Sequence, residues 1–93
     1  MTVVEIIAKR IRTLCRERRI TLSALAEMSG LSTSSVDNII HGRSKSPTMT
    51  TMMKIANTFN MTLAEFVDIP ELNNYYQEDQ DDLPEEDGDL LFR

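Results

Sequence analysis

The first eighteen residues carry an apolar stripe at helical spacing. Its members lie three or four positions apart or widen the stripe: Val3, Ile6, Ile7, Ile11 and Leu14. This period places them on one face of a helix, and the basic residues fall largely outside that face. Thr2 and Glu5 have the spacing of a capping box, in which a hydroxyl and a carboxylate bond free amides of the first turn. The pattern predicts an amphipathic helix over residues 3–18.

Two shorter helical patterns follow, each with a start signal and a stop signal. Thr21 suits the N-cap of a helix over residues 22–29, which Gly30 ends because glycine adopts a left-handed backbone without steric cost. Ser32 suits the N-cap of a third helix, over about residues 32–41, which Gly42 ends. The residues expected to face inward are Leu22, Leu25, Ala26, Val36, Ile39 and Ile40.

The second half of the domain predicts two more helices. Pro47 and Thr48 open the fourth, and Asn60 is a plausible left-handed terminator. Thr62 and Glu65 form a second capping box at the start of the fifth. The apolar residues expected to face inward are Met52, Ile55, Ala56 and Phe59 on the fourth helix and Leu63, Phe66 and Val67 on the fifth. No stretch alternates with a period of two, so the expected fold is all-α with five helices.

Charge is divided unevenly along the chain. The formal net charge of −5 comes from 10 basic and 15 acidic residues, which argues against a uniformly basic nucleic-acid binder. Residues 1–69 hold nine Lys or Arg and six acids, a net of +3, whereas residues 70–93 hold one Arg and nine acids, a net of −8. We therefore expect a compact domain over residues 1–69 and an acidic tail over residues 70–93.

Length and composition exclude several classes of protein. A chain of 93 residues has room for one small core and not for several domains or a deep catalytic pocket. No apolar run approaches the ~20 residues of a membrane-spanning helix, and nothing near Met1 has the pattern of a secretory signal. Cys15 has no partner cysteine, which excludes an intrachain disulfide and favours a cytoplasmic location.

Patterns typical of catalysis and metal binding are missing from the sequence. It contains no glycine-rich phosphate loop, no plausible pair of nucleophile and base, and no spaced set of metal ligands. His41 is the single histidine, and its place beside Gly42 favours an interaction with the end of a helix over a role as a ligand or base. We expect a protein that is not an enzyme and that needs no cofactor or metal.

Two short helices joined by a tight glycine turn have the geometry of a helix-turn-helix. A small residue, Ala26, allows close approach of the second helix, and Gly30 makes the bend. Val36 then holds the third helix against the first two. The segment Leu25-Ala26-Glu27-Met28-Ser29-Gly30-Leu31-Ser32, followed by Val36, Gly42 and Pro47, resembles the Cro/phage-repressor class of helix-turn-helix proteins, the xenobiotic-response-element family. The similarity continues through residues 52–63 and covers about residues 3–68.

This resemblance implies a function and a set of contacts. It implies a lambda-repressor-like domain whose third helix lies in the major groove of double-stranded DNA, in a transcriptional regulator acting as a homodimer on a palindromic site. The residues implied to face base edges are Thr33, Ser34, Asp37 and Asn38. Those implied to contact phosphates are Thr21, Ser23, Ser35, Arg43 and Lys45.

The sequence also departs from the family pattern. Leu22 stands where many members have a polar residue that contacts phosphate, and Met28 and Ser29 exchange the usual polar and apolar types, so the second helix is expected to pack slightly rotated. Residues 31–41 contain no Lys or Arg, so arginine cannot read guanine from within the third helix. Weak intrinsic affinity, or recognition that favours A·T pairs and DNA shape, is the expected consequence.

Other interpretations remain open at this stage. The basic residues Arg16, Arg18 and Arg19 suit a solvated face or a DNA-binding stripe, and the six methionines favour core filling over an adaptable surface. Beyond Pro70, the apolar residues Leu72, Tyr75 and Tyr76 suit an additional helix. Four alternatives are open for the acidic tail: it is only solvated, it mediates dimerisation, it covers the DNA-binding face of the domain, or it binds a protein. A second hypothesis for the function is therefore an antitoxin or adaptor whose acidic tail binds a basic partner.

Overall fold

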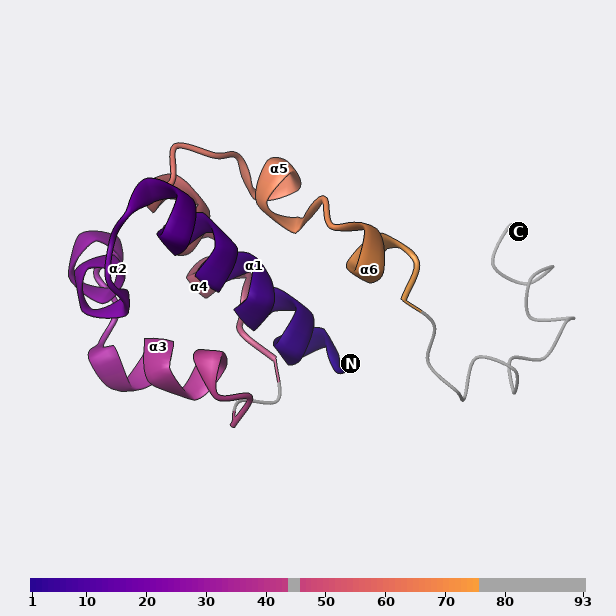
Figure 1. The fold of residues 1–93 in the computed structure, drawn as a ribbon, viewed down its shortest axis with the longest axis horizontal. Coiled ribbons are helices and arrows are strands. Elements are labelled where there is room, and N and C mark those ends of the chain that lie inside the picture. The colour runs from indigo at the N-terminus through magenta and orange to yellow at the C-terminus, as the bar shows by residue number, and fades with distance from the viewer. Residues whose placement is uncertain (44–45, 76–93) are drawn as a thin grey trace, which may run out of the picture.

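The computed structural model describes residues 1–43 and 46–75 of the chain. It contains six helices in this part: α1 (Val3–Arg18), α2 (Leu22–Ser29), α3 (Thr33–Ile40), α4 (Met49–Thr58), α5 (Leu63–Val67) and α6 (Pro70–Asn73). Figure 1 shows α1 running diagonally across the domain, with α3 on one side of it and α5 and α6 on the other. The described residues form no strand. The all-α fold and the extents of the first two helices are confirmed.

A hydroxyl side chain begins each of the first five helices. The N-cap residues are Thr2, Thr21, Ser32, Thr48 and Thr62. Each hydroxyl accepts a hydrogen bond from the backbone N–H three residues later, which satisfies one of the free donors of the first turn. The carboxylates of Glu5 and Glu65 accept from the N-cap amides at 2.7 and 2.8 Å, so both capping boxes are confirmed.

The first four helices end in one backbone arrangement. A residue with positive φ follows each of them: Arg19 (55°), Gly30 (76°), Gly42 (69°) and Asn60 (57°). The next N–H returns to the carbonyl five residues earlier, in the Schellman motif: Ile20 to Cys15, Leu31 to Ala26, Arg43 to Asn38 and Met61 to Ala56. The terminators at Gly30, Gly42 and Asn60 are confirmed. The left-handed conformation of Arg19 was not predicted.

One core joins the helices around α1, which packs against α3 and α6, while α4 packs against α2 and α5. Its largest fully buried side chains come from α1 to α5 and from the C-cap of α4: Ile7, Ile11, Leu25, Val36, Ile55, Phe66 and Phe59. Burying a side chain of this size contributes about 1.5–3 kcal/mol. Val4, Ala8 and Cys15 are also buried, whereas Val3 is only half-buried. The buried face of α1 is therefore wider than the predicted stripe, because helices cover two of its sides.

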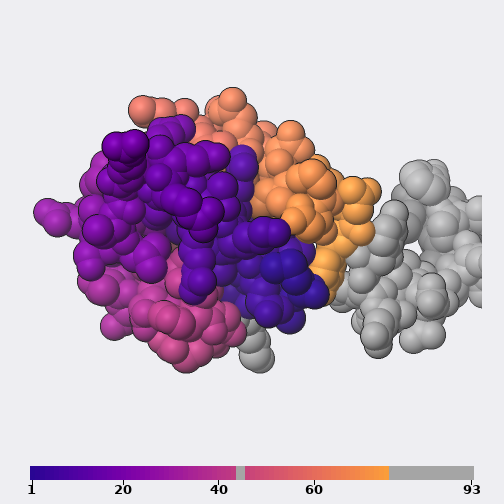
Figure 2. All heavy atoms as spheres, in the orientation of Figure 1, coloured from indigo at the N-terminus to yellow at the C-terminus, as the bar shows by residue number. Residues whose placement is uncertain are grey.

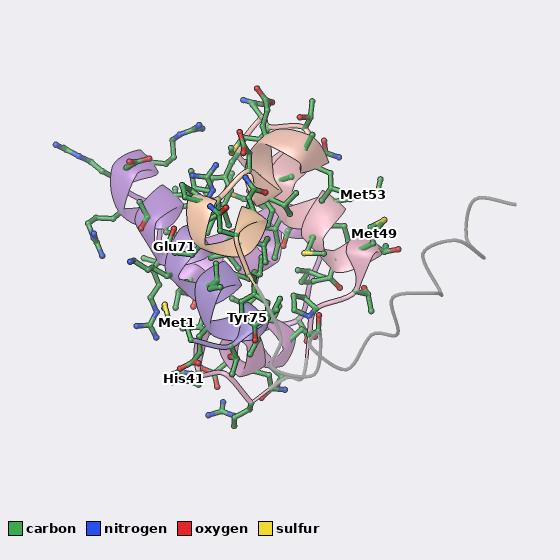
Figure 3. All side chains as sticks on the ribbon, turned by 90° about the vertical axis from the view of Figure 1, so that its right-hand side faces the viewer. Met1, His41, Met49, Met53, Glu71 and Tyr75 are labelled. Carbon is green, nitrogen blue, oxygen red and sulfur yellow. The ribbon has the colours of Figure 1, made fainter. Side chains whose placement is uncertain are left out.

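The methionines correct the prediction of core filling. Met52 and Met61 are half-buried against the core, but Met49 and Met53 are 64% and 51% exposed. Figure 3 shows these last two side chains pointing away from α4. Met28 is exposed as well, and Ser29 is half-buried with its hydroxyl donating to the Ala26 carbonyl. Met28 thus stays exposed despite the exchange of residue types in α2, and the slight rotation of this helix stays a prediction.

The segment after α5 packs onto the domain and adds a sixth helix to the five expected within residues 1–69. Lys9 of α1 pairs with Glu71 at 3.6 Å, and Leu72 and Tyr75 pack against the core. Figure 2 shows the beginning of α1 lying between α3 below and the α5–α6 segment above. The additional helix expected from Pro70 is present as the short α6. Tyr76 and the acidic residues 78–89 lie outside the described residues. No helix in the described segments is long and apolar enough to cross a membrane.

Candidate nucleic-acid interface

Helices α2 and α3 pack against each other through their inner faces. Leu25 and Ala26 of α2 are buried, as is Val36 of α3. The left-handed Gly30 ends α2, and Ser32 caps α3 two residues later, so the connection is a tight turn. The predicted roles of Ala26, Gly30 and Val36 thus agree with the geometry, which is that of a helix-turn-helix.

The other side of α3 is polar and open to solvent. Thr33, Ser34, Ser35 and Asn38 are exposed, whereas Val36, Ile39 and Ile40 are buried. The Ser35 hydroxyl accepts from the Ser32 hydroxyl at 2.9 Å. Its own proton remains free to bond an outside acceptor. The structure therefore brings the four predicted base-contact positions together on or beside one polar face, with Asp37 half-buried at its edge.

Asp37 is the centre of a polar cluster at the end of α3. Its carboxylate forms an ion pair with Arg43 and lies 3.0 Å from His41 Nδ1. Arg43 Nε also donates to Asn38 Oδ1 at 3.1 Å. The family resemblance implied a phosphate contact for Arg43, and its contacts with Asp37 and Asn38 were not predicted. Gly42 was the sequence signal that could have predicted the contacts of Arg43, because a left-handed glycine brings the following residue back over the last turn of α3.

The predicted phosphate contacts lie at two ends of the motif. The Thr21 hydroxyl is the N-cap of α2, accepting from the Ala24 N–H at 3.0 Å, and Ser23 is exposed in the first turn. A helix N-terminus offers free amide donors and a positive dipole end, both of which suit phosphate. Arg43 lies at the other end, beyond α3. Lys45 lies outside the described residues.

The arginines of α1 have contacts within the domain. Arg10 donates to the Phe66 and Glu65 carbonyls at 3.0 and 2.9 Å, and Arg12 donates to the Ile40 carbonyl at 3.2 Å. These contacts satisfy carbonyls at the C-terminal ends of α5 and α3, which have no partner within their helices. The Arg18 guanidinium lies 5.9 Å from the centroid of the Phe59 ring, within the range of a cation–π contact.

An open surface groove runs between α1 and the end of α3. Lys9, Arg12 and Arg16 line it from α1, and His41 and Gly42 line it from the far side. In Figure 3 His41 lies below Met1, which lines the same groove. The groove is separate from the polar face formed by Thr33, Ser34 and Asn38. Among the described residues, no three His, Cys, Asp or Glu side chains gather closely enough to hold a metal ion.

Among the residues that the structure describes, three groups have a shifted pKa. The Thr2 and Thr62 amides lower the pKa of the Glu5 and Glu65 carboxyls below the ordinary value of 4.5. Burial raises the pKa of the Cys15 thiol, because desolvation disfavours the thiolate. The hydrogen bonds of the capping boxes and the packing of α1 explain all three shifts.

The family model for the Cro/C1-type HTH DNA-binding domain matches residues 10–71. The chain belongs to this family. It is therefore a DNA-binding protein of the helix-turn-helix type used in transcription regulation, as the resemblance implied. No curated protein gives a significant match to this Cro/C1-type chain.

Solved structures that resemble this Cro/C1-type domain include two that match over most of its length. The first is described as the crystal structure of the prophage Lp1 protein 11, with a TM-score of 0.73 and 31% identity over 81% of this chain and 99% of that chain. The second is a SinR protein/SinI protein complex, with a TM-score of 0.61 and 22% identity over 92% of this chain and 75% of that chain. The first likeness extends over sequence and fold, and the second shows the fold.

Proposed function

We propose that the chain is a sequence-specific transcriptional regulator that reads the major groove of double-stranded DNA with the segment 32–41, which contains α3. The observation that carries this proposal is the division of α3 into two faces. Val36, Ile39 and Ile40 are buried against the domain, and Thr33, Ser34, Ser35 and Asn38 on the other side are exposed to solvent. An α-helix with such a free face fits the width of the major groove.

The proposed base contacts follow from the chemistry of the four side chains. Asn38 presents an amide that pairs with N6 and N7 of adenine, and Thr33 offers a methyl to thymine or a hydroxyl to either type of base. Ser34 donates or accepts through its hydroxyl. Asp37 only accepts, for instance from N4 of cytosine, and its ion pair with Arg43 offsets its repulsion of phosphate.

The proposed phosphate contacts flank this face. Thr21, Ser23 and the free amides of the α2 N-terminus approach the backbone on one side, with Ser35 at the start of α3. Arg43 and Lys45 approach from the loop after α3. We further propose that two copies bind a palindromic site, with half-sites about 34–36 Å apart, one turn of the double helix.

In vitro selection from a random duplex library, with the full chain, tests the proposal. We expect enrichment of a palindromic sequence and a gel shift that weakens as salt rises, since protein binding releases counterions from DNA. Asn38→Ala is expected to relax the preference at one position of each half-site. Asn57→Ala, at an exposed asparagine of α4, is the matched control and is expected to leave the selected sequence unchanged. Absence of any shift at low salt contradicts the proposal.

A second candidate function follows from the distribution of charge. Residues 78–89 hold eight acids and no base, so this segment suits capture of a basic protein surface. Replacing those eight acids by Asn or Gln is a better test than truncation after residue 69, because truncation also removes the α6 contacts with α1. This second function predicts that the neutralised chain loses binding to a lysine-rich peptide and keeps its DNA affinity. A rise in DNA affinity instead indicates that the tail covers the DNA face.

A further inference from the structure

The polar face of α3 lacks the side chain that most often reads guanine. No Lys or Arg occurs between Leu31 and His41. A guanidinium nevertheless lies beside this face, because the side chain of Arg43 returns to the last turn of α3. Its position follows from the backbone that ends the helix.

Gly42 and Arg43 form the last two positions of a Schellman motif. Gly42 is left-handed, and the Arg43 N–H donates to the Asn38 carbonyl at 2.8 Å. The residue in the position of Arg43 usually makes an apolar contact with its helix. The other three motifs follow that rule, with half-buried residues packed against the core: Ile20, Leu31 and Met61. Only at the end of α3, among these four motifs, is this residue charged and exposed.

The side chain of Arg43 makes two contacts that orient it. Its Nε donates to Asn38 Oδ1 at 3.1 Å, and its Nη2 donates to Asp37 Oδ2. A guanidinium carries five N–H donors in a planar fork, so three remain available for an outside acceptor. Asn38 in turn keeps both protons of its amide nitrogen and a second lone pair on its oxygen.

We infer that Arg43 is a base-reading residue that supplies the guanine contact missing from within α3, and that Asp37 is a positioning residue for it. This inference rests on the proposed function of α3. It replaces the phosphate role of Arg43 and the direct base contact of Asp37. The carboxylate of Asp37 holds the guanidinium beside Asn38, which leaves donors for O6 and N7 of guanine next to the base that Asn38 contacts.

The pairing also explains an acidic residue at a DNA-binding face. A free carboxylate there repels phosphates, whereas a carboxylate paired with Arg43 does not, and it restricts the rotamers of a long side chain. His41 Nδ1 lies 3.0 Å from Oδ1 of the same carboxylate and 3.0 Å from the Asp37 carbonyl, and it forms an ion pair with the carboxylate only when the imidazole is protonated. The reading unit is therefore assembled before DNA arrives.

The test is in vitro selection with the full chain and with Arg43→Lys. Lysine keeps the positive charge but lacks the planar fork of donors. We expect the wild type to select a guanine at one position of each half-site. Arg43→Lys is expected to lower the preference for that guanine about tenfold, the size expected for one bidentate contact, while the other positions change little. Arg16→Lys, on the groove face of α1, is the matched control and is expected to leave the guanine preference unchanged.

Asp37 requires variants that separate positioning from folding. Asp37→Asn is expected to reduce the same guanine preference, and Asp37→Glu, which keeps the carboxylate, is expected to restore part of it. The side chains of Asp37 and Arg43 are both about half exposed, so the thermal unfolding midpoints of the Asp37 variants are expected to stay near that of the wild type. A loss of preference without a change in the unfolding midpoint supports the positioning role.

Several results overturn the inference. If Arg43→Gln weakens binding equally on all sequences and reduces the salt slope by about one, Arg43 contacts a phosphate. If Arg43→Lys selects the same sites as the wild type, the fork of donors is not used. If the wild type selects a sequence without such a guanine, this inference fails and the proposed function of α3 stands. Enrichment of no sequence at all by the wild type overturns the proposed function itself.

Discussion

The ends of α2 and α3 share one backbone arrangement but have different surroundings. Gly30 and Gly42 are both left-handed, and the residue after each returns its N–H to the carbonyl five positions earlier. After α2 that residue is Leu31, which packs against the core, whereas after α3 it is Arg43, which pairs with Asp37 on the exposed side. The same turn thus serves packing in one place and presents a charged group in the other. The residue that follows the glycine makes the difference.

The largest expected effect separates the inner faces of these helices from the outer face of α3. Leu25→Ala removes a fully buried side chain and is expected to lower the free energy of unfolding by about 2–5 kcal/mol. Asn38→Ala, at an exposed position of α3, is expected to change the free energy of unfolding by less than about 0.5 kcal/mol. The same substitution is expected to weaken DNA recognition. Urea denaturation of both variants measures the contrast. Equal destabilisation contradicts the division into a packed face and a binding face.

The two glycines are expected to be equally sensitive to a side chain. No atom lies within 4 Å of a Cβ built on Gly30 or on Gly42, so substitution meets only backbone strain. Alanine with a left-handed backbone costs roughly 1–2 kcal/mol, and we expect this loss for both Gly30→Ala and Gly42→Ala. Only the second is expected to alter the selected DNA sequence as well, because it disturbs Arg43. A clearly larger loss of stability at one glycine indicates that its turn is strained by more than its φ angle.

The residues after the glycines are expected to differ in a smaller but measurable way. Leu31→Ala removes part of a half-buried apolar side chain and is expected to lower the free energy of unfolding by about 1 kcal/mol. Arg43→Ala breaks an exposed ion pair, which contributes about 0–1 kcal/mol. Thermal unfolding at equal protein concentration compares the two. A larger loss for Arg43→Ala shows that its contacts hold the end of α3 in place.

The smallest expected effect is on stability at low pH, and it distinguishes α1 and α5 from the two helices of the helix-turn-helix, α2 and α3. The capping-box carboxylates of Glu5 and Glu65 have a lowered pKa, whereas α2 and α3 have a hydroxyl N-cap and no acidic residue in the first turn. A lowered pKa in the folded state adds stability that is fully present above about pH 4.5 and is lost as the pH falls through the folded value. Glu5→Gln and Glu65→Gln are therefore expected to flatten the acid limb of a curve of stability against pH. If the acid limb of this curve is equally steep in the double variant, the capping boxes are not the source of the loss of stability in acid.

Local signals in the sequence were sufficient to predict most of the fold. Hydroxyl caps, glycine or asparagine terminators and helical spacing are properties of neighbouring residues, and they placed α1, α2 and the starts of α3 and α5 correctly. The left-handed Arg19 has no such signal, because its conformation follows from how Ile20 packs on the core. The exposure of Met49 and Met53 likewise depends on which side of α4 the other helices leave uncovered.

The candidate interface was less accessible to sequence reasoning. Exposure of Thr33, Ser34 and Asn38 follows from the helical period, since Val36 and Ile39 define the opposite side. The hydrogen-bond partners of the long arginine side chains were harder to predict, because each side chain can reach several acceptors and tertiary packing decides which of them it contacts. Arg10 and Arg12 therefore donate to carbonyls at the ends of α5 and α3, contacts that the sequence pattern of α1 did not indicate.

The division of α3 into two faces also has a practical consequence. Only three of the eight residues of α3 are buried in the core: Val36, Ile39 and Ile40. The exposed positions Thr33, Ser34, Ser35 and Asn38 can be randomised in a library without disturbing the packing, provided that Ser32 and Gly42 keep the two ends of the helix. The domain is in this sense a scaffold of fewer than one hundred residues on which new DNA specificities can be selected.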